Sequence, residues 1–310
     1  MQVHFDLERL PEFRNAVVTI GTFDGVHKGH QQIIGALRAE AARIGGESVV
    51  ITFDPHPRKI VHPDVSPELI TTLAEKEALL AGHDIDHLVV VPFTPAFAAQ
   101  EAEAYVSDFL VGRFRPHTLI IGYDHRFGHN RSGGYELLEQ LQERFGYRLI
   151  EIPKHVISEL SISSTKIRAS LKSSDVATAN ELLGYPFFFE GTVVHGDKLG
   201  RTIGYPTANL QYTDGDKIRL GEGVFAVRFR VGVRSGGGML SIGKRPTLHD
   251  TIERVEVNLF DFHEEIYGAT IRIEVLAYLR PQEKYGSLET LKEQLHRDKE
   301  DSLRILGSEW

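Results

Sequence analysis

Short apolar runs alternate with helical patterns through the first half of the chain. The runs that predict buried strands are 17–20, 48–53, 88–91, 119–121 and 147–152. Apolar residues at helical spacing predict helices over 30–44, 72–81, 101–112 and 134–145, and Thr72 with Glu75 has the spacing of a capping box. Because parallel strands need crossovers that cover both faces of a sheet, we expect a parallel sheet of these five strands between two helical layers.

The pattern changes after Tyr185–Pro186. Before this point, 164–171 and 175–183 have helical spacing, and Gly184 suits a C-terminal cap. After it, apolar and charged residues alternate with period 2 over 225–233, 254–259 and 271–277, which is typical of half-buried antiparallel strands. We therefore expect an α/β domain over 1–183 and a β-barrel or sandwich over 184–310, with a terminal helix over 287–306.

Composition narrows the possible functions. The chain has 310 residues, which suits two domains, and it has no cysteine, which excludes disulfides, thiolate zinc sites and cysteine nucleophiles. Its net charge is −8 and it has no long basic run, which argues against a nucleic-acid partner. No apolar stretch reaches the roughly 18 residues of a membrane span, and no secretion signal opens the chain. We expect a cytoplasmic protein, without a membrane partner, that acts on small molecules.

The segment Gly21–His30, GTFDGVHKGH, lies where a predicted strand meets a predicted helix. Helix N-termini present unpaired N–H groups that suit phosphate, and the glycines let the backbone approach a ligand. His27 and His30 can both direct N–H groups toward one phosphate chain. Neither GxxxxGK[ST] nor GxGxxG is present, and a zinc pair is disfavoured because no thiolate or obvious third ligand is nearby. The segment therefore predicts a nucleotide site of another kind.

Three further segments extend this site. In ISSTKIR, 162–168, the hydroxyls of Ser164 and Thr165 either cap a helix or, with Arg168, hold a departing pyrophosphate; the pairing with HxGH favours phosphate. FDPHP, 53–57, and GYDHRFGHNRSGG, 122–134, both follow strands and should reach the same crevice. There His56 can take a second phosphate and Asp124 a nucleobase or ribose donor. The alternatives are a proline-rich turn and a loop whose aspartate and arginine pair with each other.

HxGH followed by ISSTxIR resembles the superfamily of Rossmann-like adenylyl- and cytidylyltransferases. The resemblance implies that an incoming oxygen attacks the α-phosphate of ATP or CTP and that pyrophosphate leaves, without a covalent intermediate. Positioning and charge neutralisation do the work, with Mg²⁺ adding charge. His27, His30 and Arg168 are the predicted catalytic residues. The predicted ATP-binding set is Gly21, Thr22, Phe23, Asp24, Gly29, Asp124, Ser164, Thr165 and Lys166.

A second constellation opens the C-terminal domain with GTVVHGDKLGRTIGYPTANL, 191–210. Thr207 and Asn209 follow Pro206, a rigid turn that fixes their direction. A hydroxyl and an amide oxygen suit Mg²⁺ bound to ATP phosphates, so these two residues are the predicted metal ligands. The predicted Mg-ATP set is Gly196, Lys198, Gly200, Arg201, Pro206, Thr207 and Asn209. A plain glycine-rich turn is the alternative.

Glu256 lies on the polar face of a predicted strand, where a glutamate is usually only solvated. Its neighbours are distinctive, however: SIGKRPT at 241–247 and YG at 267–268. Taken together and in this order, the segments resemble the bacterial bifunctional riboflavin kinase/FMN adenylyltransferase family, also called FAD synthetase. The order is TIGTFDGVHKGH, TFDPHP, GYDHRFG, SSTKIR, GRTIGYPTANL, IGKRPT and VEVNLFDF with YG. The resemblance runs from about Val17 to about Leu303.

The resemblance implies two reactions that consume ATP. A six-stranded riboflavin kinase barrel would phosphorylate the ribityl 5′-hydroxyl of riboflavin, with Thr207 and Asn209 on Mg-ATP and Glu256 as the base. The Rossmann-like nucleotidyltransferase domain would then transfer AMP to FMN, with His56 on the flavin phosphate. The implied partners are ATP, riboflavin and FMN, and the implied metal is Mg²⁺.

Two positions depart from the family pattern. Asn258 lies where histidine often follows the glutamate, and His125 lies where phenylalanine is common. Neither is assigned to the chemistry, so both bear on substrate affinity. Three alternatives stay open: one activity with the other half as a flavin-binding or scaffold module, a flavin-sensing regulator, and a nucleotidyltransferase for another small phosphate with a β-domain for oligomerisation.

Overall fold

The computed structural model describes residues 1–65, 67–153, 162–196, 200, 203–246 and 251–307. The chain forms two compact units, Met1–Ser164 and Thr165–Trp310. The division falls earlier in the chain than the boundary expected after residue 183, because the second unit contains nearly all of the two helices over 164–183. The assignment of 1–183 and 184–310 to two separate activities stays a prediction.

The first unit contains a parallel sheet with strand order β1-β4-β3-β2-β5-β6. Its strands are β1 (Gln2–His4), β2 (Val17–Ile20), β3 (Ser48–Asp54), β4 (His87–Pro92), β5 (Thr118–Gly122) and β6 (Arg148–Ile152). Five of these match the predicted strands. The prediction missed β1, which is three residues long and has no apolar run; its pairing with β4 and the hydrogen bond from Gln2 N to Asp86 O (2.7 Å) define it.

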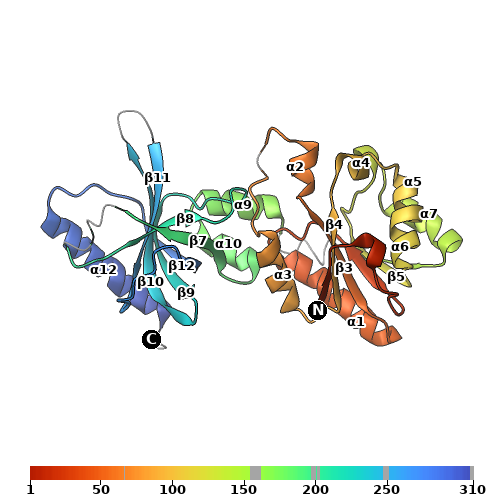
Figure 1. The fold of residues 1–310 in the computed structure, drawn as a ribbon, viewed down its shortest axis with the longest axis horizontal. Coiled ribbons are helices and arrows are strands. Elements are labelled where there is room, and N and C mark those ends of the chain that lie inside the picture. Colours follow the sequence, from red (N-terminus) through yellow and green to blue (C-terminus); the bar gives the residue numbers. More distant parts are fainter. Residues whose placement is uncertain (66, 154–161, 197–199, 201–202, 247–250, 308–310) are drawn as a thin grey trace. The chain divides into compact units, whose positions relative to one another are not determined.

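Helices cover both faces of this sheet (Figure 1). They are α1 (Lys28–Ile44), α2 (Pro57–Val61), α3 (Leu73–Ala81), α4 (Pro95–Ala98), α5 (Ala102–Ala104), α6 (Gly112–Phe114) and α7 (Tyr135–Phe145), with short 3₁₀ turns at Leu7–Arg9 and His129–Arg131. α1 and α3 pack on one face and α7 on the other. The helix predicted over 101–112 is present, but Tyr105–Val111 is a π-helix. The capping box of Thr72 and Glu75 is confirmed.

The buried side chain of Glu40 ties α1 to the sheet. It accepts hydrogen bonds from Arg43 of its own helix (2.7 and 2.8 Å), from Arg148 of β6 (2.9 Å) and from Thr118 of β5 (3.4 Å). The hydrogen bond from Arg43, together with the charges of both arginines and the Thr118 contact, lowers the pKa of Glu40 to about 2, although burial opposes the shift. Glu40 is thus ionised throughout the ordinary pH range.

The second unit is a closed antiparallel barrel with strand order β10-β11-β8-β7-β12-β9. Its strands are β7 (Phe187–Val194), β8 (Ala208–Tyr212), β9 (Gly223–Val231), β10 (Arg234–Pro246), β11 (Thr251–Leu259) and β12 (Thr270–Arg280). Inward-facing residues such as Phe189, Phe225, Val257 and Ile273 are fully buried. Between the two alternatives that the period-2 pattern left open, barrel or sandwich, the structure shows the barrel.

Three helices accompany the barrel: α9 (Ser164–Lys172), α10 (Val176–Leu183) and α12 (Leu288–Leu306). The amide of Asn180 in α10 donates to the carbonyl of Val275 in β12 (2.9 Å) and accepts from the N–H of Phe187 in β7 (2.7 Å). Gly184 ends α10 in the left-handed conformation, as predicted. These hydrogen bonds fix α10 to the wall of the barrel.

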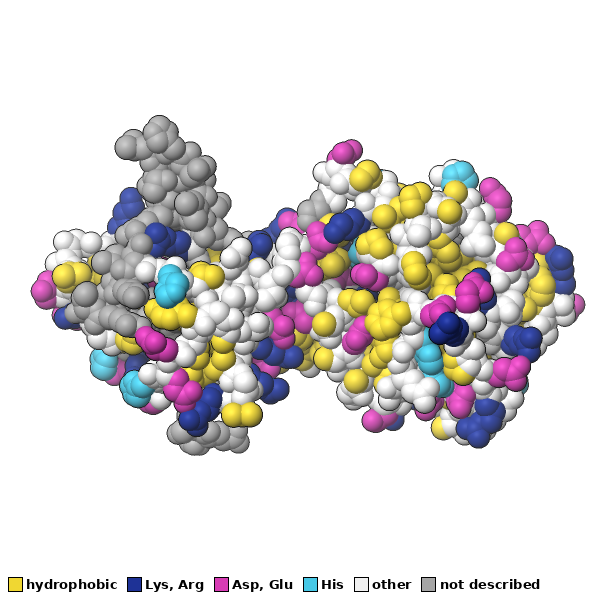
Figure 2. Space-filling view, in the orientation of Figure 1, with side chains coloured by type: hydrophobic (Ala, Val, Ile, Leu, Met, Phe, Trp, Pro, Cys, Tyr) yellow, Lys and Arg dark blue, Asp and Glu magenta, His cyan; other side chains and the backbone are white. Residues whose placement is uncertain are grey.

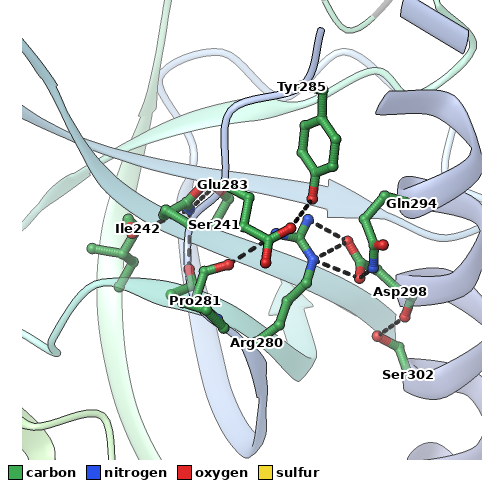
Figure 3. A network of polar contacts seen from close by, with 11 residues as sticks. Ser241, Ile242, Arg280, Pro281, Glu283, Tyr285, Gln294, Asp298 and Ser302 are labelled. Atoms are coloured by element: carbon green, nitrogen blue, oxygen red, sulfur yellow. Dashed lines mark hydrogen bonds and ion pairs between the residues drawn. The ribbon is translucent and has the colours of Figure 1, made fainter. Parts of the chain in front are cut away.

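An ion pair joins α12 to the end of β12 (Figure 3). Nε and Nη2 of Arg280 donate to both carboxylate oxygens of Asp298, at 2.7–3.1 Å. The side chains are only 15% and 2% exposed. Gln294 donates to the same carboxylate, and Ser302 donates to the backbone carbonyl of Asp298. The partners of Asp298 therefore satisfy a charge that would otherwise be costly to bury.

No described helix combines the length and the apolar character that a membrane crossing requires. On the face shown in Figure 2, basic and acidic side chains are interspersed.

Replacing Glu40 by glutamine should change how stability depends on pH. The pKa of Glu40 lies below that of an unfolded glutamate, so its contribution is complete above about pH 4.5 and is lost as the pH falls toward 2. Urea unfolding of Glu40→Gln should show a loss of stability at pH 7 that shrinks below pH 4.5. Glu143→Gln, at an exposed position of α7, is the control. A stability difference that stays constant from pH 7 to pH 3 would contradict this account.

Asp298→Ala should destabilise the second unit by about 3–5 kcal/mol, because it leaves the Arg280 cation buried without its counter-charge. The double variant Arg280→Met, Asp298→Leu should recover most of the loss, since it removes both charges. Equilibrium unfolding measures both effects. Asp301→Ala, which removes an exposed ion pair with Arg304 on the same helix, should change the free energy of unfolding by less than about 1 kcal/mol. A loss of the same size for Asp301→Ala and Asp298→Ala would contradict the role of burial.

Candidate active sites

The segment that carries HxGH forms a tight loop between β2 and α1. Phe23, Gly25 and Val26 all have positive φ angles, of 47°, 84° and 35°. Glycine is required at position 25 because a side chain there would be strained and would press on Ile70. The loop therefore turns within a few residues and places the N-terminus of α1 at the carboxyl edge of the sheet, where ligands bind in this class of fold.

A buried carboxylate holds the loop in this shape. Oδ1 of Asp24, whose residue is 2% exposed, accepts hydrogen bonds from the N–H groups of Ile70 (2.9 Å) and Thr71 (3.1 Å). The hydroxyl of Thr71 in turn accepts from the N–H of Gly25 (2.9 Å). The ring of Phe23 is buried in the core and meets His30 edge-on. Both residues shape the loop, and their predicted contact with ATP stays a prediction.

The two histidines of HxGH stack on each other at the start of α1. Their ring centroids are 3.7 Å apart and their planes differ by 13°. Nδ1 of His27 accepts from the N–H of His30 (3.3 Å), so a neutral His27 carries its proton on Nε2 and can donate from there. Burial, followed by the charges of His27 and Lys76, lowers the pKa of His30 well below its usual value. The site thus presents two stacked imidazoles, of which the His30 ring favours its neutral form.

Lys76 is the residue of this region that the sequence analysis did not identify. It lies in the first turn of α3, is 5% exposed, and donates from Nζ to the hydroxyl of Thr52 (3.1 Å). Thr52 donates onward to the carbonyl of Thr22 in the loop (3.1 Å). Burial lowers the pKa of Lys76 to about 8, against the opposing charges of Asp24 and Asp54. Its sequence context, the capping box of a helix, gives no sign of a site.

The remaining predicted residues of this site differ in whether they lie in the same compact unit as the loop. Ser164 donates to the backbone carbonyl of Asp24 (3.1 Å), so the second motif begins at the loop. Thr165, Lys166 and Arg168 belong to the second compact unit, and their part in this site stays a prediction. Gly29 is buried in the first turn of α1, and Gly21 and Thr22 are half-buried in the loop.

His56 and Asp124 both follow strands of the sheet. His56 caps α2, with Nδ1 accepting from the N–H of Arg58 (3.2 Å), and Asp124 is exposed in the turn after β5. Arg126 pairs with Glu136 (3.9 Å), so the alternative of an aspartate–arginine pair within the loop is not observed. The binding roles of His56 and Asp124 are not tested by this geometry.

Aromatic side chains line the same edge of the sheet. The half-buried rings of Phe53, Phe93 and Phe97 meet one another at centroid distances of 5.4–5.9 Å. Phe97 also contacts Tyr105, whose ring stacks on Phe127. Phe53 and Phe97 pack against the core on the α7 face of the sheet, and these half-buried rings could offer stacking partners to a planar apolar ligand.

The second site is a pocket of about 530 Å³ between the barrel and α12. Its polar lining includes Thr207, Ser241, Glu256, Asn258, Arg280, Asp298 and Tyr285. Its apolar lining includes Val224, Met239, Leu240, Leu291 and Leu295. Arg280 and Asp298, the pair that joins α12 to the barrel, thus also form part of the pocket wall (Figure 3). A pocket of this size, with both polar and apolar lining, suits an organic ligand that carries polar groups.

Glu256 lies at this pocket together with the threonine of the PTAN segment. Its Oε2 accepts from the hydroxyl of Thr207 (3.3 Å), and its Oε1 is 3.6 Å from Nη1 of Arg254. Asn209 is paired with Glu256 across β8 and β11. The amide of Asn258 donates to the carbonyl of Pro206 (2.7 Å), so this departure from the family pattern fixes the turn that carries Thr207.

A magnesium ion would find suitable oxygens here. Thr207, just before β8, supplies a hydroxyl and Asn209 in β8 supplies an amide, while the carboxylate of Glu256 lies on the neighbouring strand β11. A Cβ at Gly196 would overlap the Asn209 amide, so glycine leaves room for this side chain. Few protein oxygens are needed, because Mg²⁺ at such sites takes further ligands from phosphates and water. Gly200 is described, whereas Lys198 and Arg201 lie outside the described residues.

Comparison with known proteins assigns each half of the chain to a family. Residues 10–166 match the family model of FAD synthetase, and residues 183–306 match that of riboflavin kinase. A bifunctional riboflavin kinase/FMN adenylyltransferase of Escherichia coli strain K12 is 35% identical over 303 residues, which cover 97% of this chain and 96% of the relative. The protein of that name from Bacillus subtilis is 36% identical over 302 residues, covering 96% and 94%.

A solved structure from Streptococcus pneumoniae, described as a macrolide-efflux protein, shares the fold with a TM-score of 0.85. It is 31% identical, and the match covers 97% of this chain and 98% of that chain. The predicted resemblance is confirmed over both halves. With an FAD synthetase domain followed by a riboflavin kinase domain, the chain belongs to the bifunctional riboflavin kinase/FMN adenylyltransferase family.

Proposed function

We propose that the chain phosphorylates riboflavin at the Glu256 pocket and adenylates FMN at the HxGH loop. The observation that carries this proposal is that each compact unit holds its own phosphate-handling constellation. One has stacked imidazoles at a helix N-terminus, and the other has a carboxylate beside a hydroxyl at a pocket large enough for an organic ligand. The two constellations suit two different nucleophiles.

In the kinase reaction the nucleophile is a primary hydroxyl, which is weak near neutral pH. Glu256 accepts the proton of the ribityl 5′-hydroxyl as that oxygen bonds to the γ-phosphorus of ATP and ADP leaves. Thr207 and Asn209 would hold Mg²⁺, which when bound neutralises charge on the phosphates. The hydrogen bond from Thr207 orients Glu256 before substrate arrives.

The apolar wall of the same pocket suits the flavin ring. Met239, Leu291 and Leu295 provide apolar surface, and Tyr285 adds an aromatic ring. Arg280 and Asp298 neutralise each other, so this part of the wall is polar without carrying an uncompensated charge. Burying a planar ring there would direct the ribityl chain toward Glu256.

In the transfer reaction the nucleophile is the phosphate of FMN, which is already ionised and needs no base. Its oxygen bonds to the α-phosphorus of ATP, the bond to the β-phosphate breaks, and pyrophosphate leaves. His27 and His30 donate hydrogen bonds to the phosphate oxygens on which charge accumulates, and the resemblance adds Arg168 as a cation. Phe53, Phe93 and Phe97 would stack on the flavin.

Glu256→Gln should lower riboflavin phosphorylation by about 10²–10⁴-fold, the usual contribution of a general base, and should leave FAD formation from supplied FMN unchanged. Chromatographic separation of riboflavin, FMN and FAD measures both activities. Glu274→Gln, which changes a half-buried strand glutamate paired with Arg272, should leave both activities unaltered. Normal FMN production by Glu256→Gln would remove this residue from the mechanism.

His30→Ala should lower FAD formation by about 10²-fold or more, since it removes a donor from the developing charge, and should leave riboflavin phosphorylation nearly intact. His296→Ala, in α12, is the matched histidine control. Circular dichroism establishes that the variant is folded. If both activities fell together in a folded variant, two independent sites would be the wrong description.

A further inference from the structure

Lys76 is a buried cation beside the HxGH loop. Its side chain is almost fully removed from solvent, and Nζ donates to the hydroxyl of Thr52 at 3.1 Å. Through Thr52 it is linked to the carbonyl of Thr22, and its charge reaches His30, Asp24 and Asp54. The ammonium group is therefore linked to the loop through Thr52 and lies close enough to His30 for its charge to act on that ring.

The charge of Lys76 is not compensated by an ion pair among the residues that the structure describes, since no carboxylate there lies within 4.0 Å of Nζ. Other buried charges of the chain are treated differently. Asp298 is held by the guanidinium of Arg280, and Glu40 has two arginines. Burial disfavours the charged ammonium, and the nearby carboxylates of Asp24, Asp54 and Glu77 offset this only in part, so an anionic ligand would stabilise the charged form further.

We propose that Lys76 is a positioning residue for adenylyl transfer, whose buried ammonium, hydrogen-bonded to Thr52 beside the loop, attracts the polyphosphate of the nucleotide to the histidine pair. The proposal rests on the proposed function of the HxGH site. It assigns the positive charge of this part of the site to Lys76, because burial lowers the pKa of the neighbouring His30 well below its usual value and so disfavours a charged imidazole there. A polyphosphate chain is the class of anionic ligand that such a cation would attract.

The test compares Lys76→Met with Arg38→Met, which removes an exposed cation from the outer part of α1. Lys76→Met should lower FAD formation about 10–100-fold and weaken the binding of inorganic pyrophosphate measured by calorimetry, with riboflavin phosphorylation unchanged. The histidine titration of His30, followed by ¹⁵N NMR, should move to higher pH, since the repulsion from Lys76 is gone. Arg38→Met should alter none of these quantities.

Stability separates this role from a structural one. The pKa of Lys76 is about 8 in the folded chain and about 10.5 when unfolded, so the charged lysine destabilises the fold below pH 8 and the cost disappears as the pH rises toward 10.5. The melting temperature of Lys76→Met at pH 7 should therefore equal or exceed that of the wild type. The excess of the Lys76→Met melting temperature over that of the wild type should shrink between pH 8 and pH 10, as the wild-type lysine loses its charge.

A Lys76→Met protein with a lower melting temperature at pH 7 would overturn the proposal, because Lys76 would then be holding the fold. Wild-type FAD formation, wild-type pyrophosphate affinity or an unmoved His30 titration would each do the same. If the wild type forms no FAD at all, the proposed function fails, whereas the pyrophosphate, NMR and stability measurements still decide the role of Lys76.

Discussion

The adenylyl-transfer site depends on the hydrogen bonds that the Asp24 carboxylate accepts from the backbone of Ile70 and Thr71. A loop with three positive φ angles is costly for non-glycine residues, and it persists only where its surroundings fix it. The buried carboxylate supplies that constraint, and Thr71 adds a second one through Gly25. With the loop fixed, His27 reaches the position from which it caps α1 and stacks on His30.

The kinase site relies on a comparable backbone contact. The Asn258 amide holds the carbonyl of Pro206, and the proline ring limits the backbone that follows it. Thr207 is thereby directed at Glu256 on the adjacent strand. The second unit thus uses a side-chain amide for the task that a carboxylate performs in the first. Both devices fix a short backbone segment and leave the reactive groups at its end accessible.

Strong local signals allowed the sequence to predict most of the architecture. The apolar runs of β2 to β6 and the period-2 pattern of β9, β11 and β12 are properties of residues that are neighbours in the sequence. They can therefore be recognised without knowledge of the tertiary structure. β1 was missed because three residues carry no pattern, and the π-helical part of Tyr105–Val111 was missed because it differs from an α-helix only in its hydrogen bonds. The motif residues were found because glycine, histidine and proline are informative singly.

The contacts that tune the sites could not be predicted in the same way. Arg280 and Asp298 are separated by 18 positions, and Lys76 meets Thr52 across 24. Nothing in the local sequence distinguishes Lys76 from any other lysine early in a helix. Its burial arises when α3 packs on the sheet, and only then does its charge act on His30. Electrostatic tuning of this kind is a property of the tertiary structure.

The carboxylates of the two sites are used in opposite ways, and the difference matches the two nucleophiles. Asp24 is buried and engaged with backbone N–H groups, so it is poorly suited to take a proton from a substrate. Glu256 is only partly buried and lies at the pocket. It already accepts a hydrogen bond from the Thr207 hydroxyl, so its carboxylate is placed to accept one from a substrate hydroxyl as well. A hydroxyl nucleophile needs such a base, whereas an ionised phosphate needs donors and positive charge. Under the proposed function, the same cofactor precursor would therefore meet an accessible carboxylate while it is an alcohol, and imidazoles and a buried ammonium once it is a phosphate.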